Sequence, residues 1–227
     1  ALAQTMVDIG KLAGKPVVAV ITSMAQPLGT HIGNALEVKD AIDVLAGRTQ
    51  GDLLEISLLL GSHMLVLAEK AKTSPEARAM LDNALSSGTG LRKLAEMIAA
   101  QGGDPRVVED LSLLPQAAVK RVMRAETAGY LSAMDTTALG MAAQRMGAGR
   151  AKKSDMLDYS VGYVLHVRLG DEVTEDTPLA TLYARNEAEA EEAEKAIRKA
   201  LTIAKEKPSV PPLWDAVVTA EGITYNR

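Results

Sequence analysis

The sequence predicts an α/β fold in its first half, followed by an α+β C-terminal domain with an antiparallel sheet. The core must be aliphatic, because Phe is absent and aromatic residues make up only 3% of the 227 residues. Ala, Leu, Val and Met then fill the interior, which favours helices. One continuous apolar run precedes a Gly-containing loop and a helical pattern, whereas short strand-like runs begin beyond about Leu111. We therefore expect residues 1–110 to be part of an α/β domain with a partial mixed sheet and packed helices, and residues 111–227 to form the second domain.

The first element is a predicted helix over residues 1–13 that ends at Gly14. Neither an initiator Met nor a capping residue precedes it, so it reads as the interior of a helix already under way. We expect the chain to be a fragment of a longer protein, with an exposed apolar surface where Ala1, Leu2 and Val7 begin the helix.

Residues 16–22 are a short apolar run, which indicates a strand buried on both faces of a parallel or mixed sheet. A Gly-containing loop follows. Asn34 then caps a predicted helix that runs to Ala46, with Gly47 at its C-terminus.

Residues 51–102 read as three helices. The first is apolar around most of its circumference, so we expect it to be central. Ser74-Pro75-Glu76 begins the second, with Pro at the first helical position. The longest apolar stretch, residues 53–68, contains Glu55 and His63 and is shorter than the roughly 20 apolar residues that span a bilayer. We expect no membrane partner.

The second half alternates predicted strands and helices. Its elements are strands at 119–124 and 129–134, a helix from Asp135 or Thr136 to Met146, strands at 161–168 and 178–184 around Gly170-Asp171, a charged helix at 186–205 and a last strand at 216–219. This texture is typical of hammerhead-like, barrel-sandwich domains that carry biotin or lipoate. Those carriers need a Lys after Ala-Met, where this chain has Asp135. We predict the shared fold element and not a carrier.

Charge and composition exclude several classes of function. The net charge is −4 and the pI is near 5.5, with no basic cluster, which argues against a nucleic-acid partner. No cysteine is present for a disulfide or a thiol zinc site, and His31, His63 and His166 are isolated from one another. We expect a cytoplasmic protein. The Gly-rich segments 88–93 and 147–150 are expected to be turns or helix caps, because neither follows a convincing strand.

Residues 17–45 carry a resemblance to a known family. The strings Gln26-Pro27-Leu28-Gly29 and Gly33-Asn34-Ala35-Leu36-Glu37-Val38, at this spacing, are similar to thymidine and pyrimidine nucleoside phosphorylases. Further similar segments are 87–90, 100–104, 149–155, 161–162, 170–173 and 178–180. The chain resembles the C-terminal half of such an enzyme.

The resemblance implies a pentosyltransferase that converts a pyrimidine nucleoside and inorganic phosphate into the free base and a pentose 1-phosphate. It implies a homodimer, with the nucleoside held between a small helical domain and a larger α/β domain. The family's phosphate-binding Lys-Ser-Thr-Gly-Gly run and its base-binding Arg and Lys precede the matched region, and no such run occurs here. We therefore expect no catalytic and no substrate-binding residue in this chain, and no activity from the chain alone.

The resemblance also implies part of a site for a potassium ion. By motif, its ligands fall at the backbone carbonyls of Leu28 and His31 and the carboxylate of Asp40. Hard cations take such oxygen ligands. His31 stands where Ala is usual and Asp40 where Glu is usual, so we expect weak or absent cation occupancy.

Two other functions stay open at this point. One is a related phosphorolytic enzyme that acts on nucleotides, such as an AMP phosphorylase. The other is a non-catalytic binding module with a barrel-sandwich domain. Residues 26–38 favour the pyrimidine nucleoside phosphorylase over the nucleotide enzyme.

Overall fold

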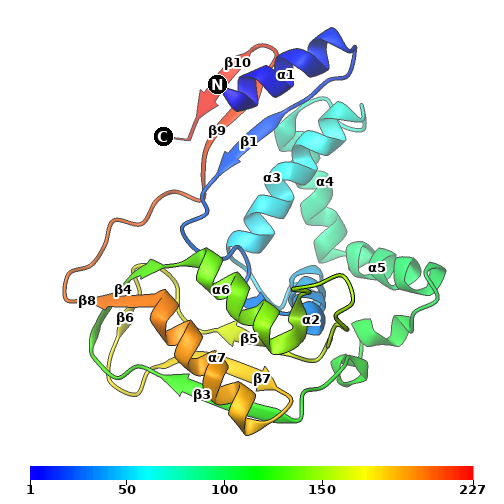
Figure 1. The fold of residues 1–227 in the computed structure, drawn as a ribbon. Helices are drawn as coiled ribbons and strands as arrows, with labels where there is room; N and C mark the ends of the chain where they lie inside the picture. Colours follow the sequence, from blue (N-terminus) through cyan, green and yellow to red (C-terminus); the bar gives the residue numbers. More distant parts are fainter. Residues whose placement is uncertain (227) are drawn as a thin grey trace. The chain divides into compact units, whose positions relative to one another are not determined.

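The computed structural model describes residues 1–226 and divides them into two compact units (Figure 1). One unit contains residues 1–23, residues 44–90 and the described residues from 211 on. The other contains residues 24–43 and 91–210. These units do not follow the expected boundary at residue 110, because strands from the C-terminal end pair with the first strand of the chain.

The first unit consists of a small sheet, a helix beside it and a helical pair. Its elements are α1 (Leu2–Leu12), β1 (Ala19–Thr22), α3 (Asp52–Leu67), α4 (Ser74–Ser86), β9 (Trp214–Thr219) and β10 (Gly222–Tyr225). The sheet order is β1-β9-β10, with both pairs antiparallel. The run that contains β1 was expected to be buried in a parallel or mixed sheet. Instead, β9 runs against β1, and Ile21 and Thr22 are exposed.

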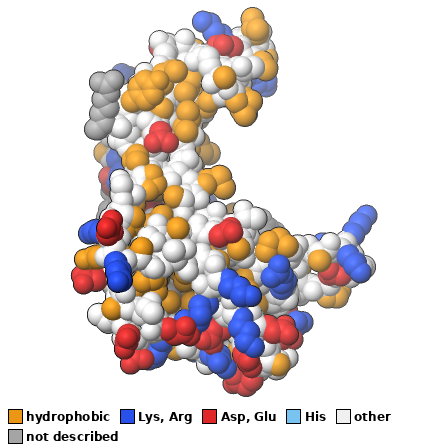
Figure 2. Space-filling model, turned by 60° about the vertical axis from the view of Figure 1, so that its left-hand side comes forward, with side chains coloured by type: hydrophobic (Ala, Val, Ile, Leu, Met, Phe, Trp, Pro, Cys, Tyr) orange, Lys and Arg blue, Asp and Glu red, His pale blue; other side chains and the backbone are white. Residues whose placement is uncertain are grey.

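Helix α1 carries a row of exposed apolar side chains. Leu2, at 75% exposure, is followed on the helix by Met6, Ile9 and Leu12, all exposed. Figure 2 shows hydrophobic side chains at the surface of this unit. The expected exposure is confirmed for Leu2. It is wrong for Val7, which is buried on the side of α1 that packs on β1 and β9.

Helix α4 begins with the predicted Pro75 in its first turn. The Thr73 hydroxyl accepts from the Glu76 N–H, and the Glu76 carboxylate accepts from the Lys72 N–H at 2.9 Å. The two side chains therefore provide acceptors for backbone N–H groups at the start of the helix. Helix α3 was expected to be central. Within the described residues it buries Ile56 on one side and exposes Met64 on another.

The second unit is built on two antiparallel sheets. Its elements are β2 (His31–Ile32), α2 (Asn34–Leu45), α5 (Thr89–Ala100), η1 (Pro105–Val108), η2 (Leu111–Leu113), β3 (Val119–Arg124), β4 (Gly129–Met134), α6 (Thr136–Ala143), η3 (Gln144–Ala148), β5 (Gly162–Leu165), β6 (Glu172–Val173), β7 (Pro178–Ala184), α7 (Glu187–Ala200) and β8 (Leu201–Ala204). The sheets have the orders β2-β5-β7-β3 and β6-β4-β8. The charged helix was expected to reach residue 205; it ends at Ala200 because the next four residues pair with β4.

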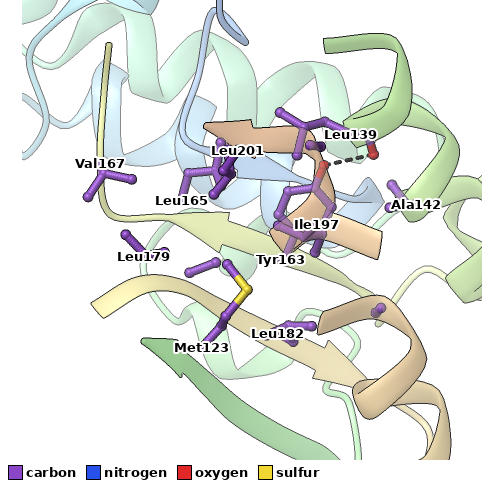
Figure 3. Packing of buried hydrophobic residues seen from close by; sticks show 14 of the residues in the cluster. Met123, Leu139, Ala142, Tyr163, Leu165, Val167, Leu179, Leu182, Ile197 and Leu201 are labelled. Atoms are coloured by element: carbon purple, nitrogen blue, oxygen red, sulfur yellow. Dashed lines mark hydrogen bonds between the residues drawn. The ribbon is translucent and has the colours of Figure 1, made fainter. Parts of the chain in front are cut away.

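The core of this unit lies between the sheets and helices α6 and α7 (Figure 3). Tyr163 is fully buried there, and its hydroxyl donates to the Leu139 carbonyl at 2.8 Å. Helix α7 buries Ala190, Ala193 and Ile197 along one side. Acidic and basic side chains are mixed on the surface of this unit (Figure 2).

Asp135 has a structural position at the start of α6. Its carboxylate accepts from the Ala138 N–H at 2.9 Å and so caps the helix, as one of the two predicted capping residues. Among the described residues, no helix is long and apolar enough to cross a membrane.

Candidate functional site

The segment that carries the resemblance forms a loop, the short strand β2 and the start of α2. Strand β2 pairs with β5, and the step from strand to helix occurs at Gly33. A Cβ on Gly162 would lie 2.1 Å from the Ile32 carbonyl oxygen, and one on Gly33 would lie 2.4 Å from the Val161 carbonyl oxygen. Both glycines have positive φ, +137° for Gly33 and +146° for Gly162. Only glycine allows the two backbones to approach this closely at the beginning of α2.

The start of α2 is hydrogen-bonded to two residues of the segment 148–159. Asn34 is the first helical residue, and its side-chain amide donates to the Ala148 carbonyl at 2.8 Å. The Ala35 N–H donates to the Tyr159 carbonyl at 3.0 Å. The helix bounds were predicted to within one residue, but Asn34, expected as the cap, is the first residue of the helix. These contacts fix the direction in which it leaves β2.

The loop before β2 is held by the last residue of β5 and by the residues that follow this strand. The Leu169 N–H donates to Gln26 Oε1 at 2.9 Å. Arg168 donates through Nη1 to the Pro27 carbonyl at 2.7 Å, and its Nη2 lies 3.4 Å from the Leu28 carbonyl oxygen. The Leu165 N–H donates to the Thr30 carbonyl at 2.8 Å. The loop therefore takes its conformation from a segment about 140 residues further along the chain.

His31 and Asp40, two of the three predicted metal-site residues, lie side by side. Nδ1 of His31 is 3.5 Å from Oδ1 of Asp40, and the Asp40 carboxylate is almost entirely buried. Thr30 Oγ1 lies 3.0 Å from the same His31 nitrogen. Burial lowers the pKa of His31, and the attraction of Asp40 only partly offsets this.

In this arrangement two of the oxygen atoms expected to hold a cation lie next to nitrogen atoms of this chain. The Leu28 oxygen already faces the Arg168 guanidinium, and an Asp40 oxygen faces the His31 ring. Within residues 1–226, no cluster of three or more His, Cys, Asp and Glu side chains could hold a metal ion. The three residues stay a prediction as ligands, one that a binding measurement tests.

Sequence reasoning missed two residues of this site. Gly162 interrupts an apolar strand pattern, which is a signal for close backbone approach that could have been used. Arg168 gave no signal, because nothing in a local pattern tells which distant carbonyls a guanidinium reaches.

The Gly-rich segments lie at helix ends, as predicted. Gly88 has φ +69° and follows α4, and Gly147 has φ +106° in the turn that closes α6. Such conformations favour glycine and end helices.

We expect the folding stability to depend on pH because of the two other histidines, His63 and His166. Burial, with a smaller effect of Lys120, lowers the pKa of His166, and burial lowers the pKa of His63. The unfolded chain therefore takes up protons first as the pH falls through about 6.5, so stability is lost from that pH downward until the folded-state pKa values are passed. We expect a lower midpoint of thermal unfolding at about pH 5.5 than at about pH 7.5.

A loss of stability between about pH 7.5 and 5.5 is due to histidines and not to carboxylates, because carboxylates take up protons at a lower pH. The hydrogen bond from Lys195 lowers the pKa of Glu191, and the stability from such a group is lost only as the pH falls below about 4.5. His166→Gln, which keeps a partner for the Thr181 hydroxyl at 2.7 Å, should reduce the acid-induced loss. Equal midpoints at both pH values for the unmodified chain would contradict the expectation.

Comparison with known families and proteins matches both halves of the chain. Residues 1–91 match the model of the glycosyl transferase family, a/b domain. Residues 130–204 match the model of the pyrimidine nucleoside phosphorylase C-terminal domain. The β1–β2 loop and most of the first compact unit lie in the first match, and the segment with Gly162 and Arg168 lies in the second.

Individual relatives match most of this chain. The pyrimidine-nucleoside phosphorylase of Geobacillus stearothermophilus is 48% identical over 187 residues, which cover 82% of this chain and 43% of that protein. The Bacillus subtilis (strain 168) enzyme is 48% identical over 186 residues, with the same coverage. The Staphylococcus aureus (strain USA300) enzyme is 42% identical over 219 residues, or 96% of this chain and 50% of that protein. The chain spans about half the length of the curated relatives it matches.

Proposed function

Because the chain belongs to the pyrimidine nucleoside phosphorylase family, we propose that it is part of an enzyme that transfers the pentose of a pyrimidine nucleoside to inorganic phosphate. The bond from C1′ to the base nitrogen breaks, with its electron pair leaving on the base. A phosphate oxygen forms the new bond to C1′. The observation that carries the proposal is the match of two domain models within one chain, together with 42–48% identity to pyrimidine-nucleoside phosphorylases.

Such a reaction needs no protein nucleophile. Positioning phosphate against C1′ and stabilising the departing base are enough to lower its barrier. We propose that the β1–β2 loop and the start of α2 form one wall of the active site. Hydrogen bonds from Arg168 and Leu169 hold this loop in place. The groups that bind phosphate and base belong to other parts of the complete enzyme, which the resemblance implies to be a homodimer.

The names of the relatives support a nucleoside substrate over a nucleotide. The capping contact of Asp135 supports a structural role for the position where a carrier domain has its Lys. The cavity beside α6 and α7, of about 170 Å³, is smaller than the roughly 300 Å³ at which ligand pockets begin. None of these features favours a second function.

A chimera tests this proposal. The matched 187 residues of the Geobacillus stearothermophilus enzyme are replaced by the corresponding residues of this chain. We expect the chimera to release uracil or thymine from uridine or thymidine in a phosphate-dependent manner, at a rate within about tenfold of the parent enzyme, because the reacting groups are retained. A folded chimera without activity, beside an active parent, would refute the proposal.

A further inference from the structure

The β1–β2 loop presents two successive backbone carbonyls to one cationic side chain. Arg168 Nη1 is 2.7 Å from the Pro27 oxygen, and Nη2 is 3.4 Å from the Leu28 oxygen. A planar guanidinium with several N–H donors suits such a pair of acceptors. Of these two carbonyls, that of Leu28 is one that the resemblance implies as a cation ligand.

The position of Arg168 is set by its own backbone neighbours. Its N–H donates to Asp171 Oδ2 at 2.7 Å, within the turn after β5. The N–H of the next residue, Leu169, donates to Gln26 Oε1 at 2.9 Å. The guanidinium is therefore brought to the loop by a backbone segment that is itself bonded to that loop.

The carboxylate of Asp40 lies next to a nitrogen of the His31 ring. It is 4% exposed, and a carboxylate buried to this extent needs a compensating donor. Nδ1 of His31 lies 3.5 Å from Oδ1. The ring therefore stands at an oxygen that a cation would have to reach.

We propose that Arg168 and His31 take the place of a bound monovalent cation in this chain. The guanidinium donates hydrogen bonds to the loop carbonyls, and the imidazole contacts the Asp40 carboxylate. The loop therefore keeps its conformation without potassium. A metal ion at the Leu28 oxygen would lie beside the Arg168 charge and be repelled by it. The proposal rests on the family assignment but not on the proposed reaction, because its readout is folding stability.

The test compares thermal unfolding in KCl, NaCl and N-methylglucamine chloride at equal ionic strength. We expect the unmodified chain to unfold at the same temperature in all three salts. Arg168→Gln should unfold at a lower temperature in N-methylglucamine chloride, and KCl should raise that temperature by about 2–4 °C because a cation then binds the exposed carbonyls. Arg168→Lys keeps the charge and should show no dependence on the cation. Arg150→Gln, which removes an exposed arginine of the same unit, is the matched control.

Two results would overturn the proposal. One is a saturable, potassium-specific rise in the unfolding temperature of the unmodified chain. The other is an Arg168→Gln variant that behaves like Arg150→Gln in every salt. Should Arg168→Gln fail to fold, calorimetric titration of the unmodified chain with KCl decides, since saturable binding contradicts the proposal and its absence supports it. An inactive chimera would leave all these unfolding temperatures unchanged, so failure of the proposed function is a separate outcome.

Discussion

Replacing Gly162 by alanine is expected to destabilise the second unit by roughly 3 kcal/mol, from about 1–3 kcal/mol of backbone strain and about 1–3 kcal/mol of overpacking. The new Cβ would lie 2.1 Å from the Ile32 carbonyl oxygen and 2.9 Å from the Gly33 Cα, and these backbone atoms have no rotamer by which to move away. The φ of +146° is also unfavourable for any other residue. Strand β2 and the start of α2 must therefore shift.

Urea unfolding of the Gly162→Ala variant measures this loss. Gly140→Ala is the matched control, because Gly140 lies in α6 and nothing lies within 4 Å of an added Cβ. That control should be neutral or more stable by up to about 1 kcal/mol, since alanine favours helix. Equal stability of the two variants would show that β2 and β5 do not approach as closely as the structure places them.

Truncation of Tyr163 to alanine is expected to cost about 3–5 kcal/mol, because it removes a fully buried aromatic ring from the core of the second unit. Figure 3 shows this ring among side chains from both sheets and from α6 and α7. The change also leaves the Leu139 carbonyl without its donor at 2.8 Å. The same burial raises the pKa of the Tyr163 hydroxyl well above its ordinary value, so it stays a hydrogen-bond donor at neutral pH.

The Tyr163→Phe variant separates the ring from the hydroxyl. It should cost about 0.5–1.5 kcal/mol, the net contribution of one hydrogen bond, because the Leu139 carbonyl still accepts the helical bond within α6. Tyr159→Ala, at an exposed tyrosine of the same unit, should stay within about 0.5 kcal/mol of the unmodified chain. If Tyr163→Phe lost as much stability as Tyr163→Ala by urea unfolding, ring packing would not be the larger contribution.

Local sequence patterns predicted most elements because their signals are local. The strands at 119–124 and 129–134 and the helix start at Ser74-Pro75 were found in place, since alternation and capping are read within a few residues. The end of α7 was not found, because residues 201–204 follow a helical pattern and become a strand only through pairing with β4. Strand β10 was not predicted, since it is short and exposed.

The candidate site was predicted only in part, because only some of its residues belong to a local sequence motif. Its motif identified the loop and α2, and the resemblance directed attention to Leu28, His31 and Asp40. The contacts that hold the loop come from Arg168 and Leu169, about 140 residues away, and depend on tertiary structure. A local pattern contains no information on such a pairing.

We propose that this chain provides the scaffold of a phosphorylase site and that the reacting groups lie elsewhere in the complete enzyme. Release of free base from uridine and thymidine, in the presence of inorganic phosphate, tests it most directly on the purified chain alone. We expect no release above the rate in buffer from the chain alone, and activity in the same assay from the chimera that contains the rest of the enzyme. Phosphate-dependent release of uracil or thymine by the chain alone would contradict it.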